Sequence, residues 1–313
     1  MKTILHCLAF AMLFASCTQG IASSQVWLTS AAGDKCAEKE AVVFQQGTAQ
    51  NAIVIDINQK KQTIDGYGGS LTESSAFVLA CLTEEQRQSV LNELFSEDGA
   101  NFPVVRTQIG SSDFSVEGKY ALNEVEGDTA MQFFSLDRDK EGFSATKYPQ
   151  IKDEQYDLYH LMKEVWAIKQ NQSDKTYRIM ANTWTAPAWM KDNKKYFAEY
   201  IEAWKAEGVN IWAVTPVNEP MGNDGGWESM DFWPQVETEF IKHYLGPTLQ
   251  RRGHQEVAIY GFDQNIFEMQ PYSDAIYGDS LACQYTTGMA VHWYGSTIGC
   301  FPEVLEAVHA KNP

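Results

Sequence analysis

Short apolar runs alternate with amphipathic stretches from residue 63 to residue 313, and this alternation limits the fold more than any other feature. The apolar runs predict strands at residues 64–67, 102–109, 178–182, 211–217, 257–261 and 288–293. Helices are expected from Thr83 onward and at residues 153–169, 196–207, 232–249 and 302–311. Alternation of this kind produces a parallel sheet. Since eight strand–helix units close a TIM barrel of about 250 residues, the six strands here predict an α/β fold of the (β/α)8 type that is incomplete.

A different pattern precedes the barrel. Lys2 and the apolar stretch 4–14 are typical of a signal peptide, and the stretch is too short to span a bilayer. Residues 13–17 resemble a bacterial lipobox, in which Cys17 would be lipidated; the alternative is an ordinary secretory signal with an incidental cysteine. We therefore expect a signal peptide at 1–16 and export to the bacterial periplasm or cell surface, with membrane contact only through a lipid anchor at Cys17.

The region between the signal and the barrel divides in two. Residues 17–40 are mostly polar and small, which predicts a tether. The apolar runs 41–44 and 53–57 predict a pair of antiparallel strands.

Composition narrows the classes of function. The formal net charge of -17 disfavours binding to nucleic acid and to anionic lipid. Outside the signal, Cys36, Cys81, Cys283 and Cys300 show no CxxC spacing, which disfavours a zinc site. Cys283 and Cys300 would either form a disulfide or remain as buried free thiols. The 9 Trp, 14 Tyr and 16 Phe residues suit contacts with flat sugar faces as well as a core.

Polar and aromatic side chains follow the predicted strands, at the edge where the active sites of TIM barrels lie. These residues are Arg106, Asp113, Trp184, Asn218, Glu219, Asp263, Gln264, His292, Trp293 and Tyr294. Carboxylates and amides bond hydroxyl groups, and aromatic rings cover apolar ring faces. The set therefore suits a neutral polyhydroxylated ligand.

Glu219 is the most informative of these residues. It lies between Asn218 and Pro220, at the end of an apolar strand. A carboxyl group that is held rigidly and partly desolvated has a raised pKa, which suits a general acid. The alternative is a loop glutamate that caps a helix.

Together these segments resemble glycoside hydrolase family 30, which contains glucosylceramidases and endo-β-1,6-glucanases. The resemblance extends over residues 40–313 and is carried by six ordered motifs, at residues 66–73, 105–115, 184–191, 212–220, 245–249 and 290–294. It implies a retaining β-glycosidase that cleaves β-glucosides, as β-1,6-glucan or a glucosylceramide-like lipid, by double displacement without cofactor or metal. It also implies that residues 41–62 are strands of an incomplete side β-sandwich and that residues 63–313 are a partial TIM-barrel catalytic domain.

The resemblance further implies a role for each site residue. Glu219 would be the acid/base, and Asn218 would hydrogen-bond the sugar 2-hydroxyl. Asp113 and Trp184 would hold the glycone by hydrogen bonds and by packing, respectively.

Three more residues would line the pocket and orient a second carboxylate, namely Arg106, His292 and Tyr294. Asp263 and Gln264 would have a supporting role.

No residue of this sequence is assigned as the second carboxylate. Retaining glycosidases need two carboxyl groups about 5–5.5 Å apart, one of them the nucleophile. In the resembled family the nucleophile follows the His-Trp-Tyr motif by about 29 residues, which is beyond Pro313. Glu268, in the loop after the fifth strand, is the disfavoured substitute. We therefore expect the chain as given to be C-terminally truncated and to lack its nucleophile; a catalytically inactive carbohydrate-binding remnant is the alternative function.

Overall fold

The computed structural model describes residues 23–44, 47, 50, 54–186, 189, 195–222, 228–294 and 299–313. The predicted signal peptide and Cys17 lie outside the described residues, so these remain predictions. The chain divides into two compact units, residues 1–63 and 64–313.

The first unit contains one antiparallel strand pair. Strand β1 (Ser23–Leu28) pairs with β2 (Ala37–Val43), with Ser23 opposite Val43 and Leu28 opposite Ala37. The tether expected at 17–40 is therefore wrong for most of the described part of that range. The strand expected at 53–57 is wrong for residues 54–57, which lie outside any strand.

Turn chemistry explains this difference. The N–H of Gly33 donates to the carbonyl of Ser30, and Gly33 has a φ of +105°. The Ser30 hydroxyl bonds Asp34, whose other carboxylate oxygen accepts from Lys39 at 2.6 Å. The turn at 29–36 thus sets the pairing of β1 with β2, whose partner lies before residue 41 rather than after it.

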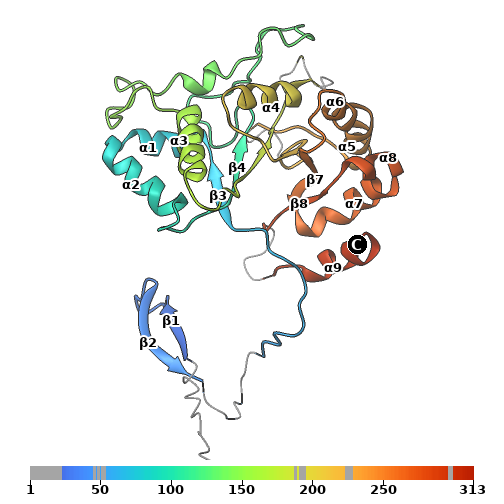
Figure 1. The fold of residues 1–313 in the computed structure, drawn as a ribbon. Coiled ribbons are helices and arrows are strands. Elements are labelled where there is room, and N and C mark those ends of the chain that lie inside the picture. Colours follow the sequence, from blue (N-terminus) through green and yellow to red (C-terminus); the bar gives the residue numbers. More distant parts are fainter. Residues whose placement is uncertain are drawn as a thin grey trace, which may run out of the picture. The chain divides into compact units, whose positions relative to one another are not determined.

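The second unit contains the predicted parallel sheet (Figure 1). Its strands, in the order in which they pair, are β3 (Gly68–Leu71), β4 (Val104–Gln108), β5 (Arg178–Asn182), β6 (Ala213–Thr215), β7 (Ala258–Asn265) and β8 (Gly288–His292). Each strand is parallel to its neighbour in the chain. The structure confirms a TIM-barrel-type sheet of six strands in the described residues.

Helices cover the outside of this sheet (Figure 1). They are α1 (Glu73–Ala80), α2 (Glu84–Phe95), α3 (Leu158–Gln170), α4 (Tyr196–Ala206), α5 (Pro234–Phe240), α6 (Gly246–Arg251), α7 (Met269–Gly278), α8 (Ser280–Tyr285) and α9 (Pro302–Lys311). A π-helical turn, Ile241–Leu245, joins α5 to α6, and single 3₁₀ turns lie at Asp137–Lys140 and Ile266–Glu268.

Capping and periodicity explain the helices that the sequence predicts. The Thr83 side chain accepts from the backbone of Gln86, and the Gln86 side chain accepts from Thr83, which confirms the capping box at the start of α2. On α3, the residues at helical spacing that face the core are Leu158, Leu161, Met162 and Val165, all buried.

The first strand of the barrel begins four residues later than predicted. A Cβ atom at Gly68 would lie 1.6 Å from the backbone oxygen of Val104, so this position admits only glycine. The glycines that mark a turn in the sequence therefore belong to β3, where they let two backbones approach closely.

Two further findings concern cysteines and membranes. Cys283 and Cys300 are free and exposed, so both alternatives weighed for them, a disulfide and a buried pair of thiols, are wrong. No helix within the described part of the chain has the length and apolar character needed to cross a bilayer.

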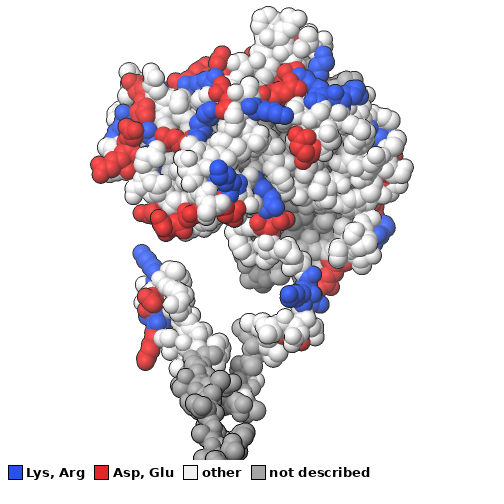
Figure 2. Space-filling view, in the orientation of Figure 1, with Lys and Arg blue, Asp and Glu red and all other residues white. Residues whose placement is uncertain are grey.

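Charged residues of both signs are mixed on the surface of the barrel unit. Lys and Arg lie among Asp and Glu on the face shown in Figure 2, without a continuous basic surface there.

Candidate active site

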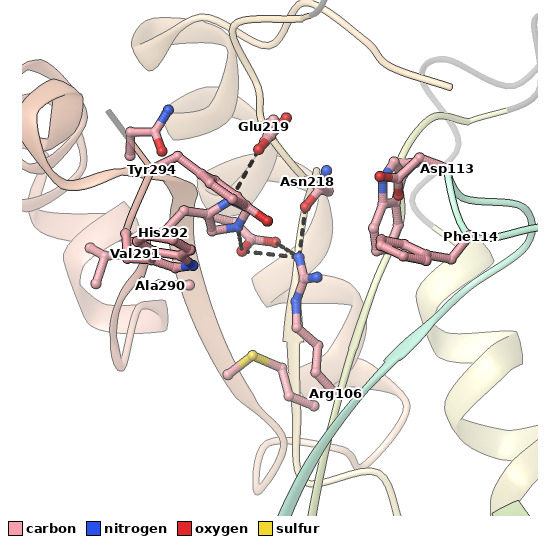
Figure 3. Close-up of a pocket in the computed structure, with 14 residues that line it drawn as sticks. Arg106, Asp113, Phe114, Asn218, Glu219, Ala290, Val291, His292 and Tyr294 are labelled. Carbon is pink, nitrogen blue, oxygen red and sulfur yellow. Dashed lines mark hydrogen bonds and ion pairs between the residues drawn. The ribbon is translucent and has the colours of Figure 1, made fainter. Parts of the chain in front are cut away.

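A pocket of about 740 Å³ lies at the C-terminal ends of the parallel strands (Figure 3). Five successive strands, β4 to β8, supply its walls directly or through the loops that follow them. The seven residues that the sequence predicts for the site all line this pocket, namely Arg106, Asp113, Trp184, Asn218, Glu219, His292 and Tyr294. The structure therefore brings the whole predicted set together in one pocket.

Backbone hydrogen bonds fix the segment that follows β6. The N–H of Asn218 donates to the carbonyl of Thr183 at 2.6 Å. The N–H of Glu219 donates to the carbonyl of Asp263 at 3.0 Å. The segments that follow β5 and β6 are thus joined to the end of β7, and the position of Glu219 depends on the chain on both sides of it.

Asp263 is the centre of the polar network behind the pocket. Its carboxylate, 3% exposed, accepts from Arg106 Nη2 at 3.0 Å and from Thr215 Oγ1 at 2.6 Å. Arg106 Nη2 also donates to Asn218 Oδ1 at 2.7 Å. Sequence reasoning gave Asp263 only a supporting role, but its carboxylate is the group on which the other polar side chains converge.

His292 connects this network to Glu219. Its Nε2 lies 2.9 Å from Asp263 Oδ1, and its Nδ1 lies 3.1 Å from Glu219 Oε1 (Figure 3). Both partners are carboxylates, which only accept hydrogen bonds when ionised. The arrangement therefore favours the doubly protonated imidazolium, which donates one N–H to each.

The pKa values of the pair agree with this geometry. Burial by itself would raise the pKa of Asp263, but the Arg106 guanidinium and His292 outweigh it and hold that pKa well below its usual range. Burial would lower the pKa of His292, but the hydrogen bonds to Asp263 and Glu219 raise it to about 9. At neutral pH the network thus consists of a carboxylate between two cations.

The backbone at the end of β7 is strained. Phe262 and Asp263 have φ values of +77° and +55°, and Glu219 has a φ of +51°. Each such non-glycine conformation costs about 1–3 kcal/mol and persists only where the surroundings fix it. The register between β7 and β8 shifts between Phe262 and Gln264, which is a β-bulge beside the pocket. This bulge directs Asp263 toward Arg106 and His292.

Asp113 lies across the pocket from His292 (Figure 3), and Trp184 also lines the pocket. The Arg106 guanidinium lies 5.0 Å from the centre of the Trp184 ring, which is buried. Partial burial raises the pKa of Asp113, and the charge of Glu219 raises it further.

Exposed aromatic rings surround the mouth. Phe114, Trp293 and Tyr294 line the pocket and are each more than half exposed. The rings of Trp293 and Tyr294 are 5.2 Å apart. Large exposed aromatic surfaces of this kind are unusual on a soluble domain and suit a ligand with apolar ring faces.

The pocket wall contains residues that the sequence did not indicate, and one indicated residue, Gln264, lies outside the wall. The lining residues that sequence reasoning did not assign to the site are Phe114, Met180, Asn265, Ala290 and Val291, and Trp293 was noted at a strand end without a role. Met180 lies between the buried residues Ile179 and Ala181 of β5, and this alternation was the available signal for it. Gln264 is buried and does not line the pocket; its side chain accepts from the N–H of Asn265.

Glu268 lies close enough to the site to interact with it electrostatically. Burial raises the pKa of this carboxyl, and the charge of Glu219 raises it further. Glu268 is not among the residues that line the pocket.

Residues 64–313 match the family model described as the glycosyl hydrolase family 30 TIM-barrel domain. The chain is 26% identical over 313 aligned residues to putative glucosylceramidase 4 of Caenorhabditis elegans, covering 92% of this chain and 56% of the relative. It is also 26% identical to an endo-1,6-beta-D-glucanase of Neurospora crassa, covering 81% of this chain and 52% of that protein.

A solved structure is similar as well. The endo-beta1,6-glucanase BT3312 superimposes with a TM-score of 0.67 and 29% identity, over 82% of this chain and 57% of that one. The chain thus spans about half the length of the relatives it matches. With the family model covering most of the chain and the sheet and pocket arranged as that fold requires, the chain belongs to glycosyl hydrolase family 30.

Proposed function

We propose that the protein is a retaining β-glycosidase that cleaves β-glucosides, with Glu219 as the general acid/base. The observation that carries this proposal is the Glu219 carboxyl group at the floor of an aromatic-walled pocket, oriented by His292 at 3.1 Å and by its own backbone bond to Asp263. Relatives named as glucosylceramidase and as endo-1,6-beta-glucanase support the same class of reaction.

The hydrogen bonds of Glu219 suit a group that gives and later takes a proton. His292 donates to Oε1, and Oε2 has no partner among the described residues. Oε2 is therefore the oxygen that would protonate the leaving group in the first step. In the second step the carboxylate would activate water, and the charge of His292 would stabilise it between the two steps.

The Asn218 amide has a defined orientation. Its Oδ1 accepts from Arg106 at 2.7 Å, which leaves the NH₂ group to donate. A donor beside the acid/base suits the sugar 2-hydroxyl, where hydrogen bonds strengthen in the transition state. Asp113 and the Trp184 ring would hold the rest of the glycone.

The nucleophile must be a carboxylate with a free oxygen facing the anomeric carbon. Asp263 cannot serve, because Arg106, Thr215 and His292 occupy its buried oxygens. We propose that the nucleophile belongs to the part of the protein that corresponds to the remaining half of its relatives. Carbohydrate binding without hydrolysis is the alternative outcome.

The substrate is a β-glucoside whose aglycone contacts the exposed aromatic rings of the mouth. Between the two substrates that the resemblance implies, the predicted export favours β-1,6-glucan over a glucosylceramide-like lipid. Both carry a β-linked glucose, so both are to be tested.

The test is an assay of the full gene product, read from its start codon to its stop codon, on p-nitrophenyl β-glucoside, β-1,6-glucan and glucosylceramide in detergent. Wild type is expected to cleave at least one of them, and Glu219→Gln is expected to lower kcat/KM by about 10²–10⁴-fold. Glu303→Gln, on the exposed surface of α9, is the matched control. Binding of gentiobiose without cleavage would replace this function by the inactive alternative.

We also propose that the protein is exported and anchored through a lipid on Cys17, on the basis of the lipobox-like residues 13–17. Metabolic labelling with radioactive palmitate should label wild type in the membrane fraction, and Cys17→Ser should be unlabelled. Export and cleavage of the signal without label would support the ordinary secretory signal instead.

A further inference from the structure

Glu237 is a buried acidic residue that the mechanism above does not use. It lies on α5, next to β7, with 1% of its surface exposed, and it does not line the pocket. Its Oε1 accepts the backbone N–H of Phe262 at 2.8 Å. Its Oε2 has no hydrogen-bond partner among the described residues. A carboxyl group buried in this way needs an explanation, because burial of an incompletely paired acid is unfavourable.

The bond to Phe262 is located at the strained part of β7. Phe262 and Asp263 are the two consecutive residues with left-handed φ values, and the register with β8 shifts there. A bulge leaves a backbone group outside the ladder of the sheet. Here that group is the Phe262 N–H, and Glu237 on α5 supplies the acceptor for it.

The packing around the carboxyl group leaves it little freedom. A Cβ atom at Gly261 would lie 3.3 Å from Glu237 Oε1 and 2.8 Å from Ile276 Cδ1. The carboxyl group thus lies directly over the backbone of Gly261, between α5 and the side chain of Ile276 on α7. Any larger residue at Gly261 would displace it.

Three contacts of the pocket depend on the conformation that this bond maintains. The carbonyl of Asp263 accepts from the N–H of Glu219 at 3.0 Å, and the carboxylate of Asp263 accepts from Arg106 and from His292. If the Phe262–Asp263 backbone relaxed from its left-handed conformation, all three would change together.

We propose that Glu237 is a positioning residue of the active site, which holds the Phe262–Asp263 bulge so that Asp263 can fix His292 and Glu219. This inference rests on the function proposed for the same pocket. Burial raises the pKa of Glu237 to about 8, and the charge of Asp263 contributes to the rise, so the group is a neutral hydrogen-bond acceptor at pH 7.

If position 237 needs only a neutral acceptor for the Phe262 N–H, then glutamine should be tolerated there and leucine should not. Glu237→Gln keeps an oxygen for the Phe262 N–H and adds no charge. Glu237→Leu fills a similar volume but removes the acceptor. Thr238→Val, at the neighbouring buried position, removes the side-chain bond to Pro234 in α5 without touching β7, and serves as the control for a general loss of stability.

The experiment compares these variants of the full gene product by two measurements. The first is kcat/KM on the cleaved substrate, with thermal unfolding to show that each variant is folded. Glu237→Leu is expected to lower kcat on the order of 100-fold with little change in KM, because a displacement of about 1 Å has that effect on a catalytic group. Glu237→Gln and Thr238→Val are expected to retain activity close to wild type.

The second measurement does not need turnover. In ¹⁵N-histidine-labelled protein, the downfield N–H signals of His292, assigned with His292→Gln, report its bonds to Asp263 and Glu219. These signals are expected in wild type and in Glu237→Gln, and they should be lost in folded Glu237→Leu. Unchanged signals in folded Glu237→Leu would overturn the inference. Signals that behave as expected in a protein without glycosidase activity would uphold it and reject the proposed function.

Discussion

Raising the pH from 6 to 10 should remove a stabilising contribution that comes from His292. The pKa of His292 is raised from its ordinary value of 6.5 to about 9 by Asp263 and Glu219, which outweigh the effect of burial. Between pH 6.5 and about pH 9, His292 keeps its proton in the folded protein but releases it in the unfolded chain. The contribution is therefore fully present below pH 6.5 and is lost as the pH rises through 9.

The size of the effect follows from the same values. A pKa change of one corresponds to 1.36 kcal/mol, so a rise from 6.5 to about 9 corresponds to about 3 kcal/mol. The His292 side chain is 14% exposed and bonded on both nitrogens, so solvent screening reduces this figure little.

The assay is urea unfolding, followed by tryptophan fluorescence at pH 6, 7, 8, 9 and 10, for wild type and His292→Gln. Glutamine can donate to Asp263 but does not titrate. Burial raises the pKa values of Asp139 and Asp157 to about 7 and that of Glu237 to about 8. These groups titrate in both proteins and cancel in the difference.

The difference in unfolding free energy between wild type and His292→Gln should fall by about 3 kcal/mol from pH 6 to pH 10. A difference that stays constant across this range would refute the reasoning, because His292 would then not be a cation in the folded protein.

Three further predictions concern the wall of the pocket and the scaffold. Trp184→Ala removes the ring beside Arg106 and should weaken gentiobiose binding by about 1–2 kcal/mol in calorimetry; an unchanged affinity would exclude Trp184 from the glycone site. Arg106→Lys should lower kcat/KM by at least about 10-fold on the cleaved substrate, because a single ammonium group is a poor substitute for a guanidinium that bonds both Asn218 and Asp263; full activity would contradict this role. Thr83→Ala should lower Tm by about 2–4 °C through the lost N-cap without changing kcat, and an unchanged Tm would show that the cap contributes nothing.

Much of the barrel could be predicted because short, mostly apolar strands alternate with amphipathic helices along the chain. The strand at 178–182 and the helix at 302–311 lie where the sequence predicts them. The strand at 68–71 was placed too early, because its glycines indicate a turn when the neighbouring backbone is unknown. Helix α7 was missed, although Met269, Tyr272 and Ile276 are buried at helical spacing.

The pocket could be predicted for a related reason. Parallel strands bring their C-terminal ends to one edge, so a residue type and a position at a strand end were enough to select Glu219 and His292. The central place of Asp263 could not be predicted, because it results from a bulge and two left-handed residues rather than from a pattern in the sequence. The contribution of Glu237 depends on a contact between α5 and β7, for which the sequence contains no signal.

The role of Glu219 as the acid/base of a retaining glycosidase is central to the proposed function. The most direct test is to compare wild type and Glu219→Ala, in the full gene product, on 2,4-dinitrophenyl β-glucoside with and without azide. With this leaving group the first step needs no acid, so the variant should accumulate glucosyl-enzyme, and azide should restore its rate and yield β-glucosyl azide. A variant that hydrolyses at the wild-type rate without azide, or one that azide leaves unchanged, would contradict the assignment of Glu219.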